Sequence, residues 1–266
     1  MRMPEEPSWH LATQRTSYVA FRLVRRCCLR TGPPPLCNRG VLTTAYTAGS
    51  PTFRENRFFH WILIGAAASI AISAFHAEKT FDWFLENSLV FFGLAVVSLT
   101  YRQIALSDLS YLCLFLFMCL HEWGAHYKYS DVPLGEWMKP WLHTHRNHYD
   151  RVAHFSFGLL YGYPMQEVAI RMARVSGAWR YYLPVECTLA LSAIYEMMEA
   201  GMASILSPER GEEFVGMQGD IWDSQEDMFM AGLGSVAAML IIYAFRKRRR
   251  ASAQREREFA TTGKLE

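Results

Sequence analysis

The stretch Met228–Phe245, MFMAGLGSVAAMLIIYAF, decides the fold class of this chain. It carries no charged side chain, and its length approaches the roughly 20 apolar residues that a helix needs to cross a bilayer. The run Arg246-Lys247-Arg248-Arg249-Arg250 follows directly, and basic residues are enriched on the cytoplasmic side of spanning helices. The stretch therefore predicts a membrane-spanning helix whose C-terminal end lies in the cytoplasm.

Five further segments upstream are apolar over a similar length. They are Phe58–Phe75, Trp83–Tyr101, Leu109–Trp123, Val152–Ile170 and Tyr181–Leu206. None alternates as the strands of a membrane barrel do, and backbone polar groups in lipid must be paired within their own segment, so the runs predict helices. The sequence thus predicts an all-α fold, a polytopic membrane helix bundle with about six transmembrane helices.

Two of these segments carry carboxylates within the predicted membrane depth. These carboxylates belong to Glu167 in the fourth segment and to Glu186, Glu196 and Glu199 in the fifth. Because an ionised side chain is costly in hydrocarbon, both helices should be buried in the bundle, away from lipid. The third segment is short unless His121 and Glu122 also lie in its helix.

The two ends of the chain are polar, and they lower the mean hydropathy of the 266 residues to +0.01. Residues 1–50 hold seven Arg and no Lys, and they lack the apolar core and cleavage site of a secretory signal. We predict a disordered basic N-terminal extension over residues 1–50, a six-span membrane domain over residues 51–245 and a basic cytoplasmic tail over residues 246–266.

Charge and cysteine content exclude several functional classes. A net charge of +2 gives no sign of a nucleic-acid partner, and the expected partner is the lipid bilayer. The six cysteines show neither metal-knuckle spacing nor a disulfide framework. The pair His121-Glu122 does not make a zinc-protease motif, because that motif needs histidines four apart and the next one is His126.

The distribution of basic residues predicts the orientation. With six spans, the N-terminal arm, the loops after the second and fourth spans and the C-terminal tail all lie on one side. These segments hold most of the Arg and Lys, whereas the opposite loop Ser207–Asp223 is strongly acidic. Since cytoplasmic loops carry the excess of basic residues, both termini should be cytoplasmic.

The same threading brings ionisable residues from distant segments to the outer face. They are His121, Glu122, Asp150, His154, Glu196, Glu199, Asp223 and Asp227. Spacings of three or four residues put neighbouring members of this set on one face of their helix. Such an accumulation needs compensation by Arg, by a cation or by shared protons.

One form of compensation is a divalent cation, because carboxylates with one or two imidazoles suit Mg²⁺, Mn²⁺, Ca²⁺ or Zn²⁺. The candidate metal ligands are His121, Glu122, Asp150, His154 and Asp227. The candidate catalytic groups are Glu196, Glu199 and Asp223, and the candidate ligand-binding residues are Asn147, Tyr127, Arg151 and Gln225. The alternative is a structural network in which Arg146 and Arg151 neutralise some acids and the rest share protons.

Four ordered motifs resemble those of a known family. They are His121-Glu122-x-Gly124-x-x-Tyr127-x-Tyr129, Asn147-x-Tyr149-Asp150-Arg151-x-x-His154-Phe155-x-Phe157-Gly158, Tyr195-Glu196-x-x-Glu199 and Gln218-Gly219-Asp220-x-Trp222-Asp223-x-Gln225-x-Asp227-Met228. They look like the motifs of the YjdF-like family, predicted multi-pass inner-membrane proteins of bacteria. The resemblance covers about residues 51–245 and implies an inner-membrane location, but it supplies no reaction.

Three functions fit these observations. The first is an enzyme at the outer membrane interface that uses a cation for hydrolysis or transfer on a lipid-like substrate. The second is a small-solute or ion-coupled transporter, which requires a polar path through the inner half as well. The third is a non-catalytic membrane sensor or scaffold, in which Arg and backbone groups satisfy the acids.

Overall fold

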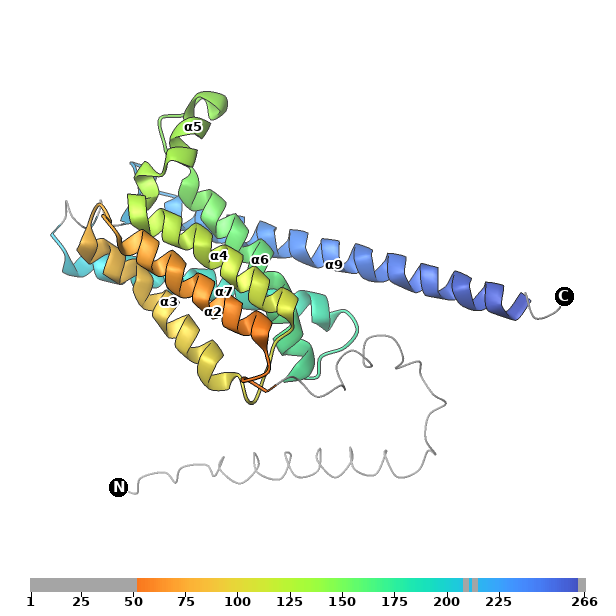
Figure 1. Cartoon of the computed structure of the whole chain (residues 1–266). Helices are drawn as coiled ribbons and strands as arrows, with labels where there is room; N and C mark the ends of the chain where they lie inside the picture. Colours follow the sequence, from red (N-terminus) through yellow and green to blue (C-terminus); the bar gives the residue numbers. More distant parts are fainter. Residues whose placement is uncertain (1–51, 208–210, 212–214, 263–266) are drawn as a thin grey trace, which may run out of the picture. The chain divides into compact units, whose positions relative to one another are not determined.

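A computed structural model of the chain describes residues 52–207, 211 and 215–262. Within these residues the fold is all-α, as predicted (Figure 1). The extension predicted over residues 1–50 lies outside the described residues.

The helices follow the predicted segments closely. They are α2 (Arg57–Ala74), α3 (Thr80–Thr100), α4 (Asp108–Tyr127), α5 (Pro133–Leu142), α6 (Tyr149–Arg171), α7 (Trp179–Ile205) and α9 (Asp223–Thr262), with a short 3₁₀ helix at Tyr129–Asp131. Each of the six apolar segments therefore corresponds to one helix. α4 includes His121 and Glu122 and continues past Trp123 to Tyr127, so it has 20 residues and the length of a span.

By length and composition, α2, α3 and α9 are candidate membrane spans. The helices α4, α6 and α7 are as long, at 20, 23 and 27 residues, but they are more polar because they carry the buried acids and histidines. α6 has the largest share of buried residues and packs against α4, α7 and α9. The most polar helices thus lie against one another.

Two glycines allow α6 and α9 to approach closely. A Cβ atom at Gly158 of α6 would collide with the backbone of Ala231 and Ser235, and one at Gly234 of α9 would collide with the backbone of Phe155 and Leu159. Small residues of this kind let helix backbones meet where hydrophobic burial gives no driving force between helices. Because of this contact, the first turns of α9 lie beside the first turns of α6.

Polar contacts connect α4, α6, α7 and α9 at the end of the bundle where α6 finishes, opposite the end where α6 begins with Asp150. Glu167 of α6 accepts hydrogen bonds from the Ser107 backbone N–H at 2.9 Å and from the Ser107 hydroxyl at 2.8 Å, and it pairs with Arg171 at 3.2 Å. Gln166 donates to the Arg180 carbonyl and accepts from Arg246 at 2.6 Å. These contacts place the basic residues of three segments at one end.

Two features differ from the sequence prediction. The last helix does not end at Phe245 but runs to Thr262, because the stretch after Arg250 is rich in Ala, Gln, Glu and Arg and the next glycine is Gly263. The segment between α4 and α6, which shows no span-length pattern, contains the helix α5. α5 begins at Pro133, since proline is well tolerated in the first turn of a helix.

Candidate functional site

The acids at the end of the bundle where α6 and α9 begin fall into two groups, and the first group pairs with arginines. Arg151 of α6 donates to Asp220 at 2.7 Å and to Glu226 at 2.8 Å, and it also contacts Asp223 at 3.4 Å. Arg146 forms a second ion pair with Asp223. We call Asp220, Asp223 and Glu226 the arginine-paired acids. The predicted structural network therefore exists, but it covers only part of the acidic cluster.

The second group surrounds His154, one turn after Asp150 on α6. The His154 Nε2 atom lies 3.6 Å from Asp150 Oδ1 and 3.3 Å from Glu196 Oε1 of α7. One ligand atom each of Asp150, His154 and Asp227 lies within 4.8 Å of the other two. We call Asp150, Glu196 and Asp227 the histidine-facing acids. Among the described residues none of them forms an ion pair with an arginine.

Two oxygen atoms of the histidine-facing acids are buried without a hydrogen-bond partner in the described part of the chain. They are Glu196 Oε1 and Asp227 Oδ1, on side chains of residues that are only 6% and 2% exposed. A buried carboxylate oxygen without a donor costs free energy, so each of them needs a proton or a cation. The site is therefore arranged to take up positive charge.

The His154 ring is held in position from its other side. Its Nδ1 atom lies 3.3 Å from the hydroxyl of Ser192 on α7. When Nδ1 carries the proton and donates to this hydroxyl, Nε2 presents a lone pair toward the acids. Metal-ligating histidines are ordinarily fixed by such a second contact. Ser192 is one turn before Glu196, so the same face of α7 supplies both contacts.

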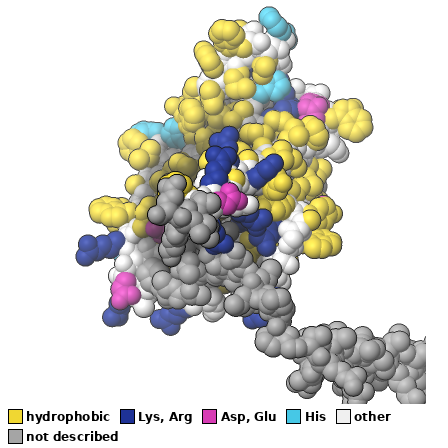
Figure 2. All heavy atoms as spheres, turned by 90° about the vertical axis from the view of Figure 1, so that its right-hand side faces the viewer, with side chains coloured by type: hydrophobic (Ala, Val, Ile, Leu, Met, Phe, Trp, Pro, Cys, Tyr) yellow, Lys and Arg dark blue, Asp and Glu magenta, His cyan; other side chains and the backbone are white. Residues whose placement is uncertain are grey.

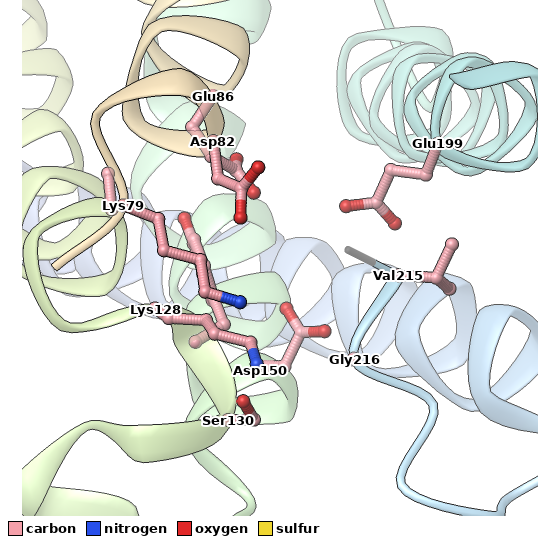
Figure 3. A pocket seen from close by; sticks show the side chains of 11 residues that line it. Lys79, Asp82, Glu86, Lys128, Ser130, Asp150, Glu199, Val215 and Gly216 are labelled. Carbon is pink, nitrogen blue, oxygen red and sulfur yellow. The ribbon is translucent and has the colours of Figure 1, made fainter. Parts of the chain in front are cut away.

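A cavity opens beside this group (Figure 3). Asp82 and Glu86 of α3, Asp150 of α6 and Glu199 of α7 point into it from different helices, and the amines of Lys79 and Lys128 face the same space. The volume open to the centre of a water molecule is about 30 Å³, which admits an ion with one or a few waters. Asp150 belongs to both the cavity and the histidine-facing group, so the cavity gives access to the group.

Asn147 holds the segment that leads into α6. It exchanges two hydrogen bonds with Gln218, from the Asn147 N–H to the Gln218 side chain at 2.9 Å and from the Gln218 amide to the Asn147 carbonyl at 3.1 Å. Its own side chain donates to the Val132 carbonyl and to Glu136 and accepts from the Tyr149 N–H. Each of these bonds connects protein to protein, so Asn147 fixes the start of α6 relative to two loops.

Burial and the arginines also determine the charge of the neighbouring His148. This residue precedes α6 and lies outside the predicted spans. Burial lowers the pKa of His148, and the charges of Arg151 and Arg146 lower it further. The lowered pKa favours the neutral imidazole, and the arginines provide positive charge that faces the arginine-paired acids.

The structure separates four predicted site residues from the His154 group. His121 is buried and its Nδ1 lies 2.7 Å from the hydroxyl of Tyr129, a residue that lines the cavity. Glu122 faces α2 instead, where it contacts the Ser73 hydroxyl. Tyr127 is 37% exposed at the end of α4, and Gln225 is exposed on the first turn of α9.

The sequence prediction left several residues out of the site: Lys79, Asp82, Glu86 and Lys128 line the cavity, and Ser192 and Glu226 contact predicted site residues. Ser192 orients His154, and its signal was the spacing of four residues from Glu196. Glu226 pairs with Arg151, and its signal was the spacing of three residues from Asp223. Neither spacing shows by itself which partner a side chain meets on a different helix.

Comparison with known proteins identifies relatives. Residues 58–248 match the family model described as predicted membrane protein, DUF2238. The chain is 33% identical over 170 residues to the inner membrane protein YjdF of Escherichia coli (strain K12). The aligned region covers 64% of this chain and 81% of that protein. No solved structure gave a match. Because the family model covers most of the chain and the relative matches over most of its own length, the chain belongs to the DUF2238 family of predicted membrane proteins.

Proposed function

We propose that this protein is a six-span protein of the inner membrane that holds a divalent cation at its outer face. The location follows from the similarity to the E. coli inner membrane protein. Support for six spans comes from α4, α6 and α7, whose acids and histidines are largely buried, which is how spans with acids are tolerated in lipid; Glu186, near the start of α7, is exposed.

Support for cytoplasmic termini comes from the end of the molecule seen in Figure 2. Lys and Arg side chains gather near the middle of this face, with hydrophobic side chains around them. Arg171, Arg180 and Arg246 lie together near the C-terminal end of α6, because Gln166 and Glu167 contact all three residues. By the positive-inside rule this end faces the cytoplasm, and the histidine-facing acids face outward.

The cation site rests on one observation. Asp150, His154 and Asp227 bring one ligand atom each to within 4.8 Å, and Asp227 Oδ1 is buried beside them without a donor among the described residues. Two carboxylates and one imidazole suit Mn²⁺, Mg²⁺ or Zn²⁺. Glu196, at 3.3 Å from His154, is placed to assist as a further ligand or as a base.

A cation in this position would act at the edge of the cavity. It would polarise a phosphoryl or acyl group or activate water, and Glu196 or Glu199 would accept the proton. Lys79 and Lys128 also line the cavity, but four carboxylates outnumber them, so an anionic group such as a phosphate would enter only with the bound cation to offset these acids. The function that fits best is metal-dependent hydrolysis or transfer on a lipid-like substrate that reaches the outer face.

The contacts of the inner half favour this function over transport. A transport path would use the polar residues Gln166 and Glu167, but both are engaged by Arg246, Arg171 and Ser107. Below the acids, Gly158 and Gly234 bring α6 and α9 into backbone contact. These contacts close the route that would lead from the site toward the cytoplasm between these two helices.

The test is direct metal binding by the purified full-length protein. After removal of metals with a chelator, Mn²⁺ is titrated and the bound fraction is followed by electron paramagnetic resonance. We expect one tight Mn²⁺ site per chain. Asp227→Asn and His154→Ala should each lower the Mn²⁺ affinity by more than about tenfold, and Ser192→Ala should lower it by about tenfold.

Matched controls distinguish ligands from bulk charge. Asp131→Asn removes an exposed acid of the loop before α5, and Glu186→Gln removes an exposed acid of α7. Both should bind Mn²⁺ like the wild type. Equal binding by the wild type and by Asp227→Asn would overturn the proposal.

A further inference from the structure

The short helix α5 exposes its largest apolar side chains. Trp137, Trp141 and Leu142 are 64%, 72% and 51% exposed, and the two indole rings contact each other at 6.0 Å between centroids. Its polar groups are engaged within the protein, since Glu136 accepts from Asn147 at 2.9 Å and pairs with Lys139 at 2.6 Å. In a water-soluble protein the apolar face would be the covered one.

The first turn fixes α5 in this orientation. Gly135 packs so closely against the Asn147 side chain that a Cβ atom would collide with it. The Val132 carbonyl, just before the helix, accepts a hydrogen bond from Asn147 at 3.0 Å, and Leu134 packs on the buried cluster that contains Tyr149. The outward position of the tryptophans is therefore built into the fold.

The place of α5 in the bundle agrees with this. The helix projects from the end where α4 finishes and α6 begins, and it runs across the direction of α9 (Figure 1). A helix that lies across the spans with Trp and Leu facing outward is the pattern of an interfacial helix, and Trp is enriched at the level of the lipid headgroups. Trp123, in the last turns of α4, is also 38% exposed, as expected of a Trp near the end of a span.

We infer that α5 lies in the headgroup region of the bilayer, with Trp137 and Trp141 inserted among the phospholipids. The inference goes beyond the proposed cation site and does not depend on it. That the leaflet is the outer one follows from the proposed orientation, whereas the depth follows from α5 itself. Tyr129 and Ser130, which line the cavity, belong to the short 3₁₀ helix that leads into α5 through Val132, so the inserted helix holds this part of the cavity near headgroup level.

The experiment reads the depth of individual tryptophans by ¹⁹F NMR. The full-length protein is labelled with 5-fluorotryptophan and placed in nanodiscs of phosphatidylethanolamine and phosphatidylglycerol. Single Trp137→Phe and Trp141→Phe variants assign the two resonances, and Trp83, which is 5% exposed, serves as the internal control. A lipid with a nitroxide on its headgroup should broaden the Trp137 and Trp141 resonances several-fold more than the Trp83 resonance.

Two other outcomes would overturn the inference. Broadening by a water-soluble gadolinium chelate, without broadening by the labelled lipid, would mean that α5 stands in solvent. Broadening by neither agent would mean that a protein surface, from another chain or a second copy, covers the two tryptophans.

Discussion

The arginine-paired acids and the histidine-facing acids both include residues of α9 but differ in how their charge is met. Asp223 and Asp227 are one turn apart on α9, yet Asp223 contacts Arg146 and Arg151 whereas Asp227 faces His154. The first group has its cations built into the sequence. The second has one neutral or singly charged imidazole for three carboxyl groups, and two of its oxygens lack donors in the described residues.

This difference separates a structural role from a binding role. A buried ion pair need not make a protein more stable than apolar residues in the same place would. Removing one partner of the pair, however, strongly destabilises the protein, because it leaves a buried charge unpaired. The arginine-paired acids should therefore matter for folding. The histidine-facing acids are held at a cost that a bound cation would offset, so their loss should affect ligand binding more than stability.

The largest effect is expected from breaking the arginine-paired group. Replacing Arg151 with Met leaves Asp220 and Glu226 without their main partner and weakens the pairing of buried Asp223, so we expect a loss of about 3 kcal/mol in the free energy of unfolding. Thermal unfolding of the protein in detergent measures it. Arg102→Met, at an exposed position of the opposite end, should change the stability by less than about 0.5 kcal/mol.

The second prediction compares the two aspartates of α9 directly. Without metal, Asp223→Asn should lower the free energy of unfolding by about 1–3 kcal/mol, and with it the unfolding midpoint, because it disrupts buried charged hydrogen bonds. Asp227→Asn should leave the midpoint unchanged or raise it, since it removes a buried charge without a donor. With Mn²⁺ at about 100 times its dissociation constant, the wild type should gain about 2.7 kcal/mol.

The metal response decides between the two roles. Asp227→Asn should show none of this gain, while Asp223→Asn should keep most of it. If both variants behaved alike, with and without metal, the distinction between the two groups would be wrong.

The helices and their order could be predicted from the sequence, because apolar length and the need to pair backbone groups in lipid leave few alternatives. The meeting of Asp150, His154 and Asp227 at one end of the bundle could also be predicted, since it depends only on threading and on helical spacing. The family assignment rests on the ordered motifs, and the comparisons confirm it.

The partners of individual side chains could not be predicted, because they depend on helix rotation and on interhelical distance. His121 and Glu122 are adjacent on α4, yet one contacts Tyr129 and the other contacts Ser73. Asn147 was a candidate ligand-binding residue, but its hydrogen bonds hold the start of α6 to Gln218 and Val132. The helix α5 escaped prediction because its ten residues are too few for a recognisable period.

The smallest effect concerns Asp220, the arginine-paired acid that lies in the loop before α9. Its pKa is below the usual value of 3.8, because its carboxylate accepts the Trp222 N–H at 2.9 Å and also bonds to Arg151. A carboxyl group whose pKa is lower in the folded state stabilises the fold above its unfolded pKa, and this contribution is lost as the pH falls through the folded pKa. The difference in unfolding midpoint between the wild type and Asp220→Asn should therefore be constant near neutral pH and shrink below about pH 4. Unfolding curves recorded from neutral to acid pH measure this difference, and a difference that grew in acid would show that Asp220 does not belong with the acids that the arginines stabilise.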